Sequence, residues 1–237
     1  MPHDGIALNL DTIRRRIHAA ADRAGRSPAT VTLVAVSKTF SAEHVRAAAA
    51  AGQRVFGENR VQEAAPKMDA LADLDLEWHL IGHLQSNKAR KAVPSFAWIE
   101  SIDSIDLLKK VDAAAAELGL RRSILLQADL AHESTKHGAD SAALRPLVDA
   151  ALGSRSLDLR GLMLVPPIPD QPEDSRRWFQ QLRALRDALV ADGVPADRLA
   201  DLSMGMSHDF EVAIEEGATV VRVGSAIFGT RPSAPGP

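Results

Sequence analysis

Lys38 ends the short run Leu33-Val34-Ala35-Val36-Ser37-Lys38, which is apolar up to Ser37. A run without polar alternation predicts a strand buried on both faces, as in a parallel sheet. Ligand sites of α/β folds lie at the carboxyl edge of such strands, where Lys38 would stand. A lysine amine withdrawn from water loses its proton more readily and can form a Schiff base with a carbonyl cofactor. The alternative is a strand-end lysine that reaches solvent, and this stretch alone favours that alternative.

A second group of residues has the composition of a phosphate site. Residues 219–225 (TVVRVGS) read as a strand, a glycine and the start of a helix. Backbone N–H groups at a helix start bind phosphate, and the glycine, Gly224, lets the phosphate approach. Residues 203–207 (SMGMS) supply hydroxyls and another glycine from the preceding strand. Each piece is a weak signal alone, but together, at the last two strand–helix junctions of a barrel, they predict a phosphate site.

Arg222 is an arginine within an otherwise apolar strand. The alternation of side chains along that strand places Val220 and Arg222 toward the interior of a barrel. A guanidinium in such a place is costly unless it is paired. Arg222 is therefore either held by a structural carboxylate or serves as a donor to a ring nitrogen or a phosphate of a ligand.

Other groupings of reactive residue types carry less weight. His79 and His83 have a helical metal-ligand spacing, but Gly82 lies between them and the glutamate of a zinc-protease motif is absent. We interpret both as non-metal residues, with His79 at the barrel mouth. The run Ser207-His208-Asp209 holds the residue types of a catalytic triad, but neighbours in sequence cannot form that relay, so it is interpreted as a helix cap.

The elements that must position these groups alternate regularly between strand and helix. Apolar runs predict eight strands, at 33–38, 54–56, 78–81, 97–102, 122–128, 159–164, 199–203 and 219–223. Helical patterns follow them at 42–51, 60–71, 85–91, 104–118, 141–152, 174–191, 207–216 and from 225, after an amphipathic helix at about 9–24. Eight such units predict an α/β fold closed into a (β/α)8 TIM barrel, with a doubly wound open sheet as the rival.

The composition narrows the class of protein. The chain has 237 residues, 46% hydrophobic and 25% charged, which is ordinary for a globular protein. A net charge of -3 favours neither nucleic-acid nor membrane-surface partners. The absence of cysteine excludes disulfides and thiolate metal sites, and the first residues do not resemble a secretory signal. We therefore expect a cytoplasmic protein with no bound metal.

With these residues in hand, the chain resembles the YggS/PROSC family, the pyridoxal phosphate-binding homeostasis proteins. The matching segments run in the family's order and are 34–38 (VAVSK), 56–63 (FGENRVQE), 78–88 (WHLIGHLQSNK), 101–104 (SIDS), 160–163 (RGLM), 202–207 (LSMGMS) and 221–229 (VRVGSAIFG). The resemblance implies a fold-type III barrel like the N-terminal domain of alanine racemase. It would occupy residues 1–230 as a single domain, with a flexible tail at 231–237.

The resemblance also implies roles for individual residues. Pyridoxal phosphate would form an internal aldimine with Lys38, and Arg222 would face the pyridine nitrogen. Asn59 would contact the ring side, and the phosphate would be held by Ser203, Gly224 and Ser225. An arginine cannot donate its proton outright, so the ring nitrogen would stay largely neutral and the cofactor would be a poor electron sink.

Three residues depart from the family's pattern. Arg60 stands where an aromatic residue is usual, Asp129 replaces asparagine, and His208 replaces a common aspartate. We expect these differences to alter the shape of the mouth and not the attachment of the cofactor. Lys136 is expected to be solvated, with a role as a second amine near the site as the alternative.

The composition also bears on whether the barrel is a carrier or an enzyme. Alanine racemases resemble this barrel but add a β-domain and use a tyrosine as second base, and decarboxylases of this fold use a cysteine; this chain has neither residue type. We therefore expect a monomeric carrier that holds pyridoxal phosphate on Lys38 for its homeostasis, without amino-acid turnover. Apo forms of pyridoxal phosphate-dependent enzymes would be its recipients. The alternatives are a fold-type III racemase or decarboxylase, or a barrel enzyme acting on a phosphorylated sugar.

Overall fold

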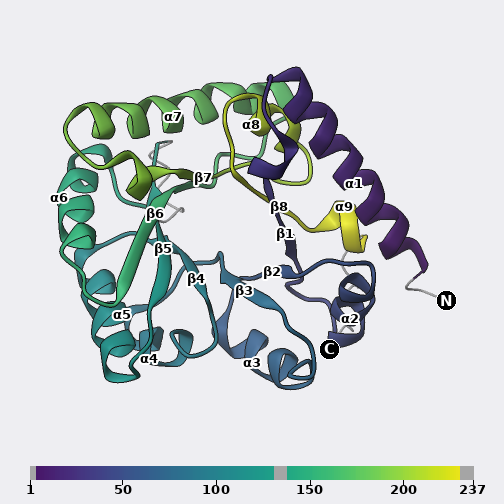
Figure 1. The fold of residues 1–237 in the computed structure, drawn as a ribbon, viewed down its shortest axis with the longest axis horizontal. Helices are drawn as coiled ribbons and strands as arrows, with labels where there is room; N and C mark the ends of the chain where they lie inside the picture. The colour runs from purple at the N-terminus through teal and green to yellow at the C-terminus, as the bar shows by residue number, and fades with distance from the viewer. Residues whose placement is uncertain (1–3, 131–137, 230–237) are drawn as a thin grey trace.

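The computed structural model describes residues 4–130 and 138–229, and their eight parallel strands form a closed barrel (Figure 1). The strands are β1 (Thr32–Val36), β2 (Val55–Glu58), β3 (Glu77–Leu80), β4 (Trp98–Ile102), β5 (Arg122–Ala128), β6 (Leu157–Leu164), β7 (Asp201–Ser203) and β8 (Val220–Val223). They pair in chain order, and β1 closes the ring against β8, with Val34 opposite Arg222. The prediction of a (β/α)8 barrel is confirmed, and the open-sheet rival is wrong.

Helices surround the ring of strands on its outside (Figure 1). They are α1 (Asp4–Arg23), α2 (Ala42–Ala50), α3 (Val61–Asp69), α4 (Ala89–Ala92), α5 (Ile105–Glu117), α6 (Ser141–Leu152), α7 (Arg176–Ala191), α8 (Phe210–Glu215) and α9 (Ser225–Phe228). Each crossover helix buries an apolar stripe against the strands, for example Phe179 and Leu182 of α7. None of the helices within the described residues is long and apolar enough to cross a membrane.

Several predicted boundaries shift in the structure. The first helix begins at Asp4 and not near Asn9, whose side-chain amide donates to the carbonyl of Ile227 at 2.9 Å. The predicted helix over 174–191 is a 3-10 turn, η3 (Pro172–Ser175), followed by α7. The predicted helix over 207–216 begins only at Phe210, so Ser207 is not its cap. The tail at 231–237 and Lys136 lie outside the described residues.

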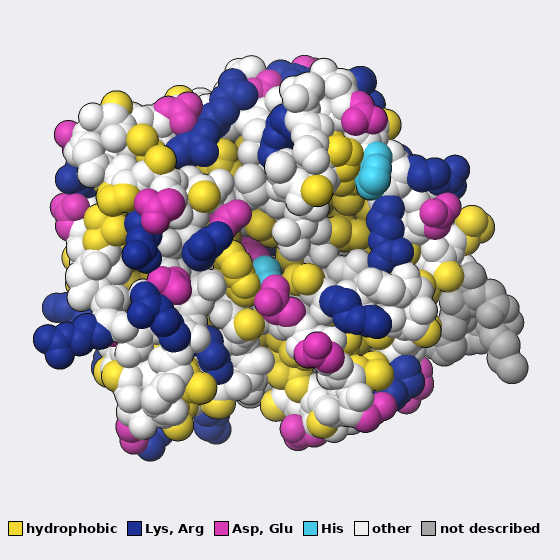
Figure 2. Space-filling model, in the orientation of Figure 1, with side chains coloured by type: hydrophobic (Ala, Val, Ile, Leu, Met, Phe, Trp, Pro, Cys, Tyr) yellow, Lys and Arg dark blue, Asp and Glu magenta, His cyan; other side chains and the backbone are white. Residues whose placement is uncertain are grey.

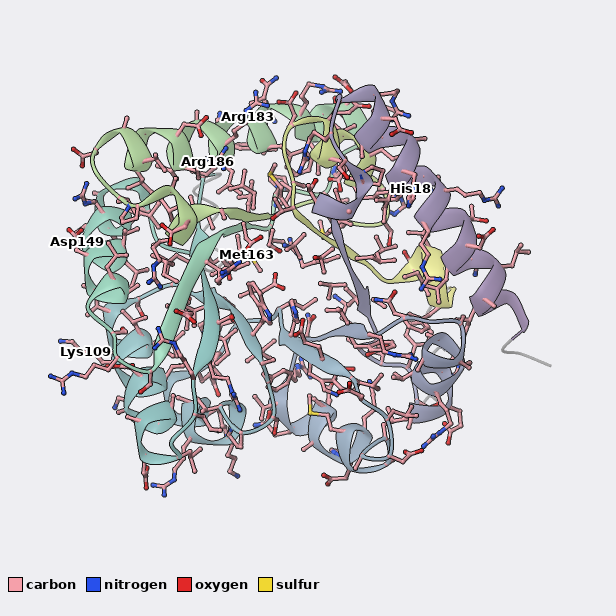
Figure 3. The ribbon with its side chains drawn as sticks, viewed as in Figure 1. His18, Lys109, Asp149, Met163, Arg183 and Arg186 are labelled. Atoms are coloured by element: carbon pink, nitrogen blue, oxygen red, sulfur yellow. The ribbon has the colours of Figure 1, made fainter. Side chains whose placement is uncertain are left out.

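The barrel interior is unusually polar for this fold. Most TIM barrels fill their interior with layers of branched apolar side chains. In Figure 3, Met163 of β6 lies inside the ring, whereas Lys109 and Asp149 extend outward from α5 and α6. Glu100 of β4 lies 3.8 Å from the guanidinium of Arg222 on β8, and because these strands are on opposite sides of the ring, the contact crosses the interior.

One glycine is required where two strands approach closely. A Cβ atom on Gly161 of β6 would lie 1.8 Å from the carbonyl oxygen of Asp201, which belongs to the neighbouring strand β7. No side chain fits at that distance, so the close approach of β6 and β7 depends on glycine. The pairing places Ser203 beside Met163 at the carboxyl end of the barrel.

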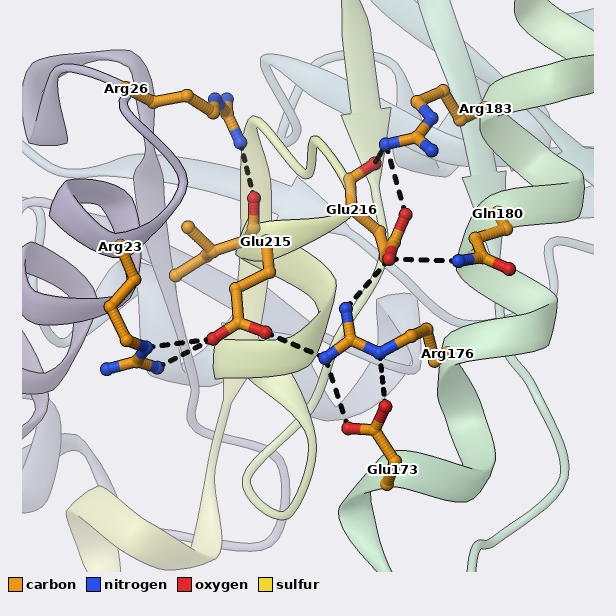
Figure 4. A network of polar contacts seen from close by, with 9 residues as sticks. Arg23, Arg26, Glu173, Arg176, Gln180, Arg183, Glu215 and Glu216 are labelled. Carbon is orange, nitrogen blue, oxygen red and sulfur yellow. Dashed lines mark hydrogen bonds and ion pairs between the residues drawn. The ribbon is translucent and has the colours of Figure 1, made fainter.

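An ionic cluster outside the barrel joins α1, η3, α7 and α8 (Figure 4). Its centre is Arg176, whose guanidinium contacts Glu173, Glu215 at 2.7 Å and Glu216 at 2.7 Å. Glu215 also pairs with Arg23 of α1 at 2.8 Å. The cluster therefore ties the first helix to the last third of the barrel. On the face shown in Figure 2, by contrast, basic and acidic side chains are interspersed.

We expect Arg176→Ala to lower the free energy of unfolding by about 1–3 kcal/mol, because Glu216 is buried and three carboxylates would lose a shared partner. Urea unfolding at low and high salt measures this, and the loss should shrink as salt rises. Arg90→Ala is the matched control, since its pair with Glu117 is exposed on both sides. Equal losses for the two variants would contradict the expectation.

Candidate functional site

A cavity of about 510 Å³ lies at the carboxyl ends of the strands. Five of the six predicted site residues line it, and they come from three separate parts of the chain: Lys38, Asn59, and the segment that holds Arg222, Gly224 and Ser225. The remaining wall is largely apolar, from Val36, Phe40, Ile81, Val165, Pro166, Ile168, Pro169 and Met206, and is completed by Ser207, His208, Asp209 and Gly229. The structure thus brings an amine, a carboxamide, a guanidinium and a glycine turn to one hollow. Such a concave, mostly apolar site with a few polar groups is typical of cofactor binding.

Lys38 stands two residues after the end of β1 and is half-buried. The backbone before it is held by Ser37, whose N–H donates to the carbonyl of Gly57 at 3.0 Å. The residue after it, Thr39, has a φ of 68°, which is a strained conformation for a β-branched side chain. Strain of this kind persists only where the surroundings enforce it, so the strand end that carries Lys38 is tightly constrained.

A buried ion pair constrains this strand end. The ammonium of Lys67, on α3, donates to the carbonyl of Ser37 at 2.8 Å and to Glu58 at 2.5 Å. The Ser37 hydroxyl donates to the same Glu58 oxygen at 2.7 Å. This cluster was not predicted from the sequence. The one sequence feature that pointed to it was Glu58 in the FGENRVQE segment. The spacing of the residues does not indicate that Lys67 pairs with Glu58 or with Ser37.

Asn59 is positioned by a close backbone contact. A Cβ atom on Gly82 would lie 2.3 Å from the carbonyl oxygen of Asn59, so only glycine allows the segment after β3 to pack against it. The carbonyl of Gly82 in turn accepts a hydrogen bond from Ser101 of β4 at 2.7 Å. Three consecutive strand ends therefore fix the position of Asn59 at the cavity wall.

The turn between β8 and α9 forms another part of the cavity wall. The hydroxyl oxygen of Ser207 accepts hydrogen bonds from the N–H groups of Gly224, at 3.2 Å, and Ala226, at 3.5 Å. A Cβ atom on Gly224 would crowd Val36, with its carbonyl oxygen at 3.2 Å, so glycine lets this turn lie against β1. Convergent N–H groups and a hydroxyl at a helix start form a suitable cradle for phosphate.

Ser203 lies elsewhere than its predicted role requires. Its hydroxyl is fully buried, accepts from a guanidinium N–H of Arg222 and donates to Glu100 at 2.5 Å. It is not among the residues that line the cavity, whereas Ser207 is. The SMGMS segment does supply a hydroxyl to the cavity, but from its last residue, because Ser203 ends β7 with its side chain directed into the barrel interior.

Arg222 is buried and lines the cavity, and its partners are now identified. Besides Ser203, it donates to the carbonyl of Leu164 at 2.7 Å. Burial lowers the pKa of Arg222, and the nearby carboxylates of Glu100 and Asp209 act in the opposite direction. A guanidinium titrates so far above neutrality that Arg222 remains charged. The first alternative is therefore confirmed, because Glu100 is a structural carboxylate 3.8 Å from the guanidinium. The second, a donor to a ligand, stays a prediction for an arginine that lines the cavity.

His79 lies inside the barrel and not at its mouth, where the sequence analysis placed it. Its Nδ1 is 2.6 Å from Glu100 and its Nε2 is 3.1 Å from Glu77. Burial acts to lower the pKa of His79, yet the hydrogen bonds to these two carboxylates raise it above its ordinary value. The pKa of Glu100 is lowered despite its burial, because His79 and Arg222 stabilise its ionised form.

The three departures from the family's pattern lie at different distances from the cavity. His208 is one of its lining residues. Arg60 precedes α3, where its exposed side chain pairs with Glu63 at 2.9 Å, and it is not a lining residue. Asp129 follows β5, and its backbone N–H donates to the carbonyl of Ala139 at 2.9 Å. Of the three, His208 is the one placed to alter the cavity itself.

Comparison with known proteins agrees with this geometry. Residues 8–232 match the family described as alanine racemase, N-terminal domain. The pyridoxal phosphate homeostasis proteins of Aquifex aeolicus and Escherichia coli K12 are each 42% identical to the chain, over 94% and 95% of it and 96% and 97% of their own lengths. The structure of PipY from Synechococcus elongatus PCC7942 with pyridoxal phosphate bound has a TM-score of 0.83 and 43% identity, covering 94% of this chain and all of PipY.

The alanine racemase of Clostridium difficile 630 shares the fold alone, with a TM-score of 0.74 at 15% identity, covering 97% of this chain and 58% of the racemase. Fold and cavity together define a barrel of the alanine racemase N-terminal type, with its ligand groups at the carboxyl ends of the strands. Within that class, the chain belongs to the family of the pyridoxal phosphate homeostasis proteins.

Proposed function

We propose that this protein binds pyridoxal 5'-phosphate covalently through Lys38 and serves its homeostasis as a carrier, without turning over amino acids. The observation that carries the proposal is the single cavity that unites the Lys38 amine, the Arg222 guanidinium and the turn at Gly224. The names of the curated relatives, and the PipY structure with pyridoxal phosphate bound, support the same ligand.

The residues present fit the parts of this cofactor. For the phosphate we propose the N–H groups of the turn at Gly224 and Ser225, together with the Ser207 hydroxyl in place of Ser203. A phosphate oxygen is a stronger acceptor than the hydroxyl, which now holds the N–H groups of Gly224 and Ala226 at 3.2 and 3.5 Å. Asn59 would contact the side of the ring, and Arg222 would face its nitrogen.

The chemistry follows from the amine and the guanidinium. When bound, the cofactor supplies an aldehyde. Lys38 would supply the amine that condenses with it, the two amine hydrogens leaving with the aldehyde oxygen as water. Arg222 would face the ring nitrogen and keep its own proton, which would leave the ring a poor electron sink. This arrangement favours storage over the carbanion chemistry that a racemase or decarboxylase requires.

Borohydride reduction of the protein saturated with pyridoxal phosphate tests the proposal. We expect a stable adduct on the peptide that contains Lys38, found by mass spectrometry, together with a visible absorbance band that reduction abolishes. Incubation with a panel of L- and D-amino acids then tests the carrier role. Multiple turnovers of any amino acid would refute it, and a protein without the absorbance band would refute pyridoxal phosphate binding altogether.

We further propose that the protein works as a monomer in the cytoplasm and hands the cofactor to apo forms of pyridoxal phosphate-dependent enzymes. The exposed position of Ile168, at the rim of the cavity, supports a handover at the mouth. Transfer is measured by mixing the loaded protein with an apo-enzyme and following the activity that the apo-enzyme regains. Regain no faster than from free pyridoxal phosphate at the same concentration would contradict direct handover.

A further inference from the structure

A chain of buried polar side chains runs through the barrel interior to the cavity. It begins at Glu77, which stands at the amino end of β3 and is 46% exposed. From there, hydrogen bonds connect His79 of β3, Glu100 of β4, Ser203 of β7 and Arg222 of β8. The last four residues are buried, and no step of the proposed cofactor attachment uses the first four.

The hydrogen-bond partners and the charges of these residues limit where their protons can lie. A guanidinium only donates, so the Ser203 oxygen accepts from Arg222 and its single hydrogen must go to Glu100. The other Glu100 oxygen faces Nδ1 of His79 at 2.6 Å, and Glu77 faces Nε2 at 3.1 Å. The pKa values of Glu77 and Glu100 are both lowered, which favours their ionised forms. Ionised carboxylates only accept, so with both ionised the two ring nitrogens of His79 carry hydrogen. The chain thus alternates in charge, with two cations and two anions.

The surroundings of His79 suit an imidazolium. Its ring stacks on that of Trp98 in β4, with centroids 5.1 Å apart and planes 16° apart. The face of an aromatic ring attracts a cation, so this contact adds to the two carboxylates. On β6, the guanidinium of Arg160 lies 5.9 Å from the Trp98 ring and pairs with Asp201 at 3.3 Å, which offsets its charge.

We propose that Glu100 is the positioning residue for Arg222: through Ser203 it holds the guanidinium against the cavity, and His79, held as an imidazolium by Glu77, keeps Glu100 in place. This inference depends on the proposed function, because it assigns Arg222 to the ring nitrogen of pyridoxal phosphate. Glu100 is not among the residues that line the cavity, so it can affect ligand binding only through Arg222.

A ligand analogue separates this role from a merely structural one. The test compares dissociation constants for pyridoxal phosphate and for an analogue with C–H in place of the ring nitrogen. Wild-type protein should prefer pyridoxal phosphate by about tenfold or more, the typical contribution of a hydrogen bond from a charged group. In Glu100→Gln this preference should fall to near one, because the amide places a donor against Ser203 or His79 and removes the charge beside Arg222.

Two variants complete the comparison. Ser203→Ala removes only the bridging oxygen and should lose the same preference, which keeps the test valid if Glu100→Gln fails to fold. Glu216→Gln is the matched control, because Glu216 is a buried carboxylate paired with Arg176 and Arg183 outside the barrel. Glu216→Gln should lower the free energy of unfolding and leave the preference for pyridoxal phosphate over the analogue unchanged. An unchanged preference in both Glu100→Gln and Ser203→Ala, or a wild-type preference near one, would overturn the inference.

An independent measurement needs neither a variant nor the cofactor. The ¹⁵N chemical shifts of the His79 ring in wild-type protein should show two protonated nitrogens at neutral pH. A single neutral tautomer would overturn the alternating-charge chain. Failure of the wild-type protein to bind pyridoxal phosphate at all would instead refute the proposed function. The ¹⁵N measurement would still test whether the hydrogen-bonded residues from Glu77 to Arg222 alternate in charge.

Discussion

Replacing Lys38 with alanine is expected to abolish all covalent attachment of pyridoxal phosphate. Lys38 is the lysine that lines the cavity among the described residues, and the turn at Gly224 lines the same hollow. Without the amine no C=N bond forms, so the visible band should disappear and borohydride should fix no cofactor. The phosphate turn and Arg222 remain, so the variant should still bind the cofactor reversibly and more weakly.

The measurement is the visible spectrum before and after borohydride, with the adduct mapped by mass spectrometry. Lys91→Ala is the matched control, because Lys91 is an exposed lysine on α4 that does not line the cavity. It should keep the band and the adduct. Cofactor fixed to another lysine in Lys38→Ala would show that the amine of Lys38 is not the attachment point.

The architecture was predictable because it rests on local signals. Unbroken apolar runs mark strands that are buried on both faces, and β5 and β6 were predicted nearly residue for residue. The predicted boundaries were wrong where a short helix could begin at more than one residue. The helix predicted from Ser207 begins at Phe210, because residues 207–209 form a turn. Ser207 has the residue type of a helix cap, but its oxygen is engaged with Gly224 from the next strand unit, a tertiary contact that sequence spacing does not report.

The site was predictable to the extent that its residues stand at strand ends. Lys38 and Asn59 stand just after β1 and β2, Arg222 is the next-to-last residue of β8, and a parallel barrel brings those strand ends together. The supports behind them were not predictable, because they depend on pairings across the barrel. The contact between His79 and Glu100 joins residues 21 positions apart, and that between Ser203 and Glu100 joins residues 103 positions apart. No periodicity in the chain encodes such pairs.

The second large effect is expected at the ion pair beneath the Lys38 strand end. Lys67→Met should lower the free energy of unfolding by about 3–5 kcal/mol, as the loss of one partner of a buried pair usually does. Glu58 is fully buried, and its Oε2 already has no hydrogen-bond partner among the described residues. Removing the ammonium leaves that carboxylate with the Ser37 hydroxyl as its remaining donor there, and it leaves the Ser37 carbonyl without the ammonium.

Urea unfolding followed by circular dichroism measures the loss, and a second variant isolates its cause. Glu58→Gln combined with Lys67→Met removes the uncompensated charge while a side-chain oxygen still accepts from Ser37. The double variant should therefore regain about 2 kcal/mol or more relative to Lys67→Met alone. A single variant that loses less than about 1 kcal/mol, or a double variant no more stable than the single, would mean that the pair does not support this strand end.

The same variants connect stability to cofactor attachment. The ammonium of Lys67 bonds to the carbonyl of Ser37, the residue directly before Lys38, so its loss frees the peptide unit that orients the attachment point. In Lys67→Met we expect faster hydrogen exchange at the Ser37 amide, which donates to Gly57, and slower formation of the visible band on addition of pyridoxal phosphate. If the double variant restores stability but not the rate, the ammonium orients Lys38 directly. If the stability and the rate recover together, the Lys67 ammonium acts by stabilising the fold.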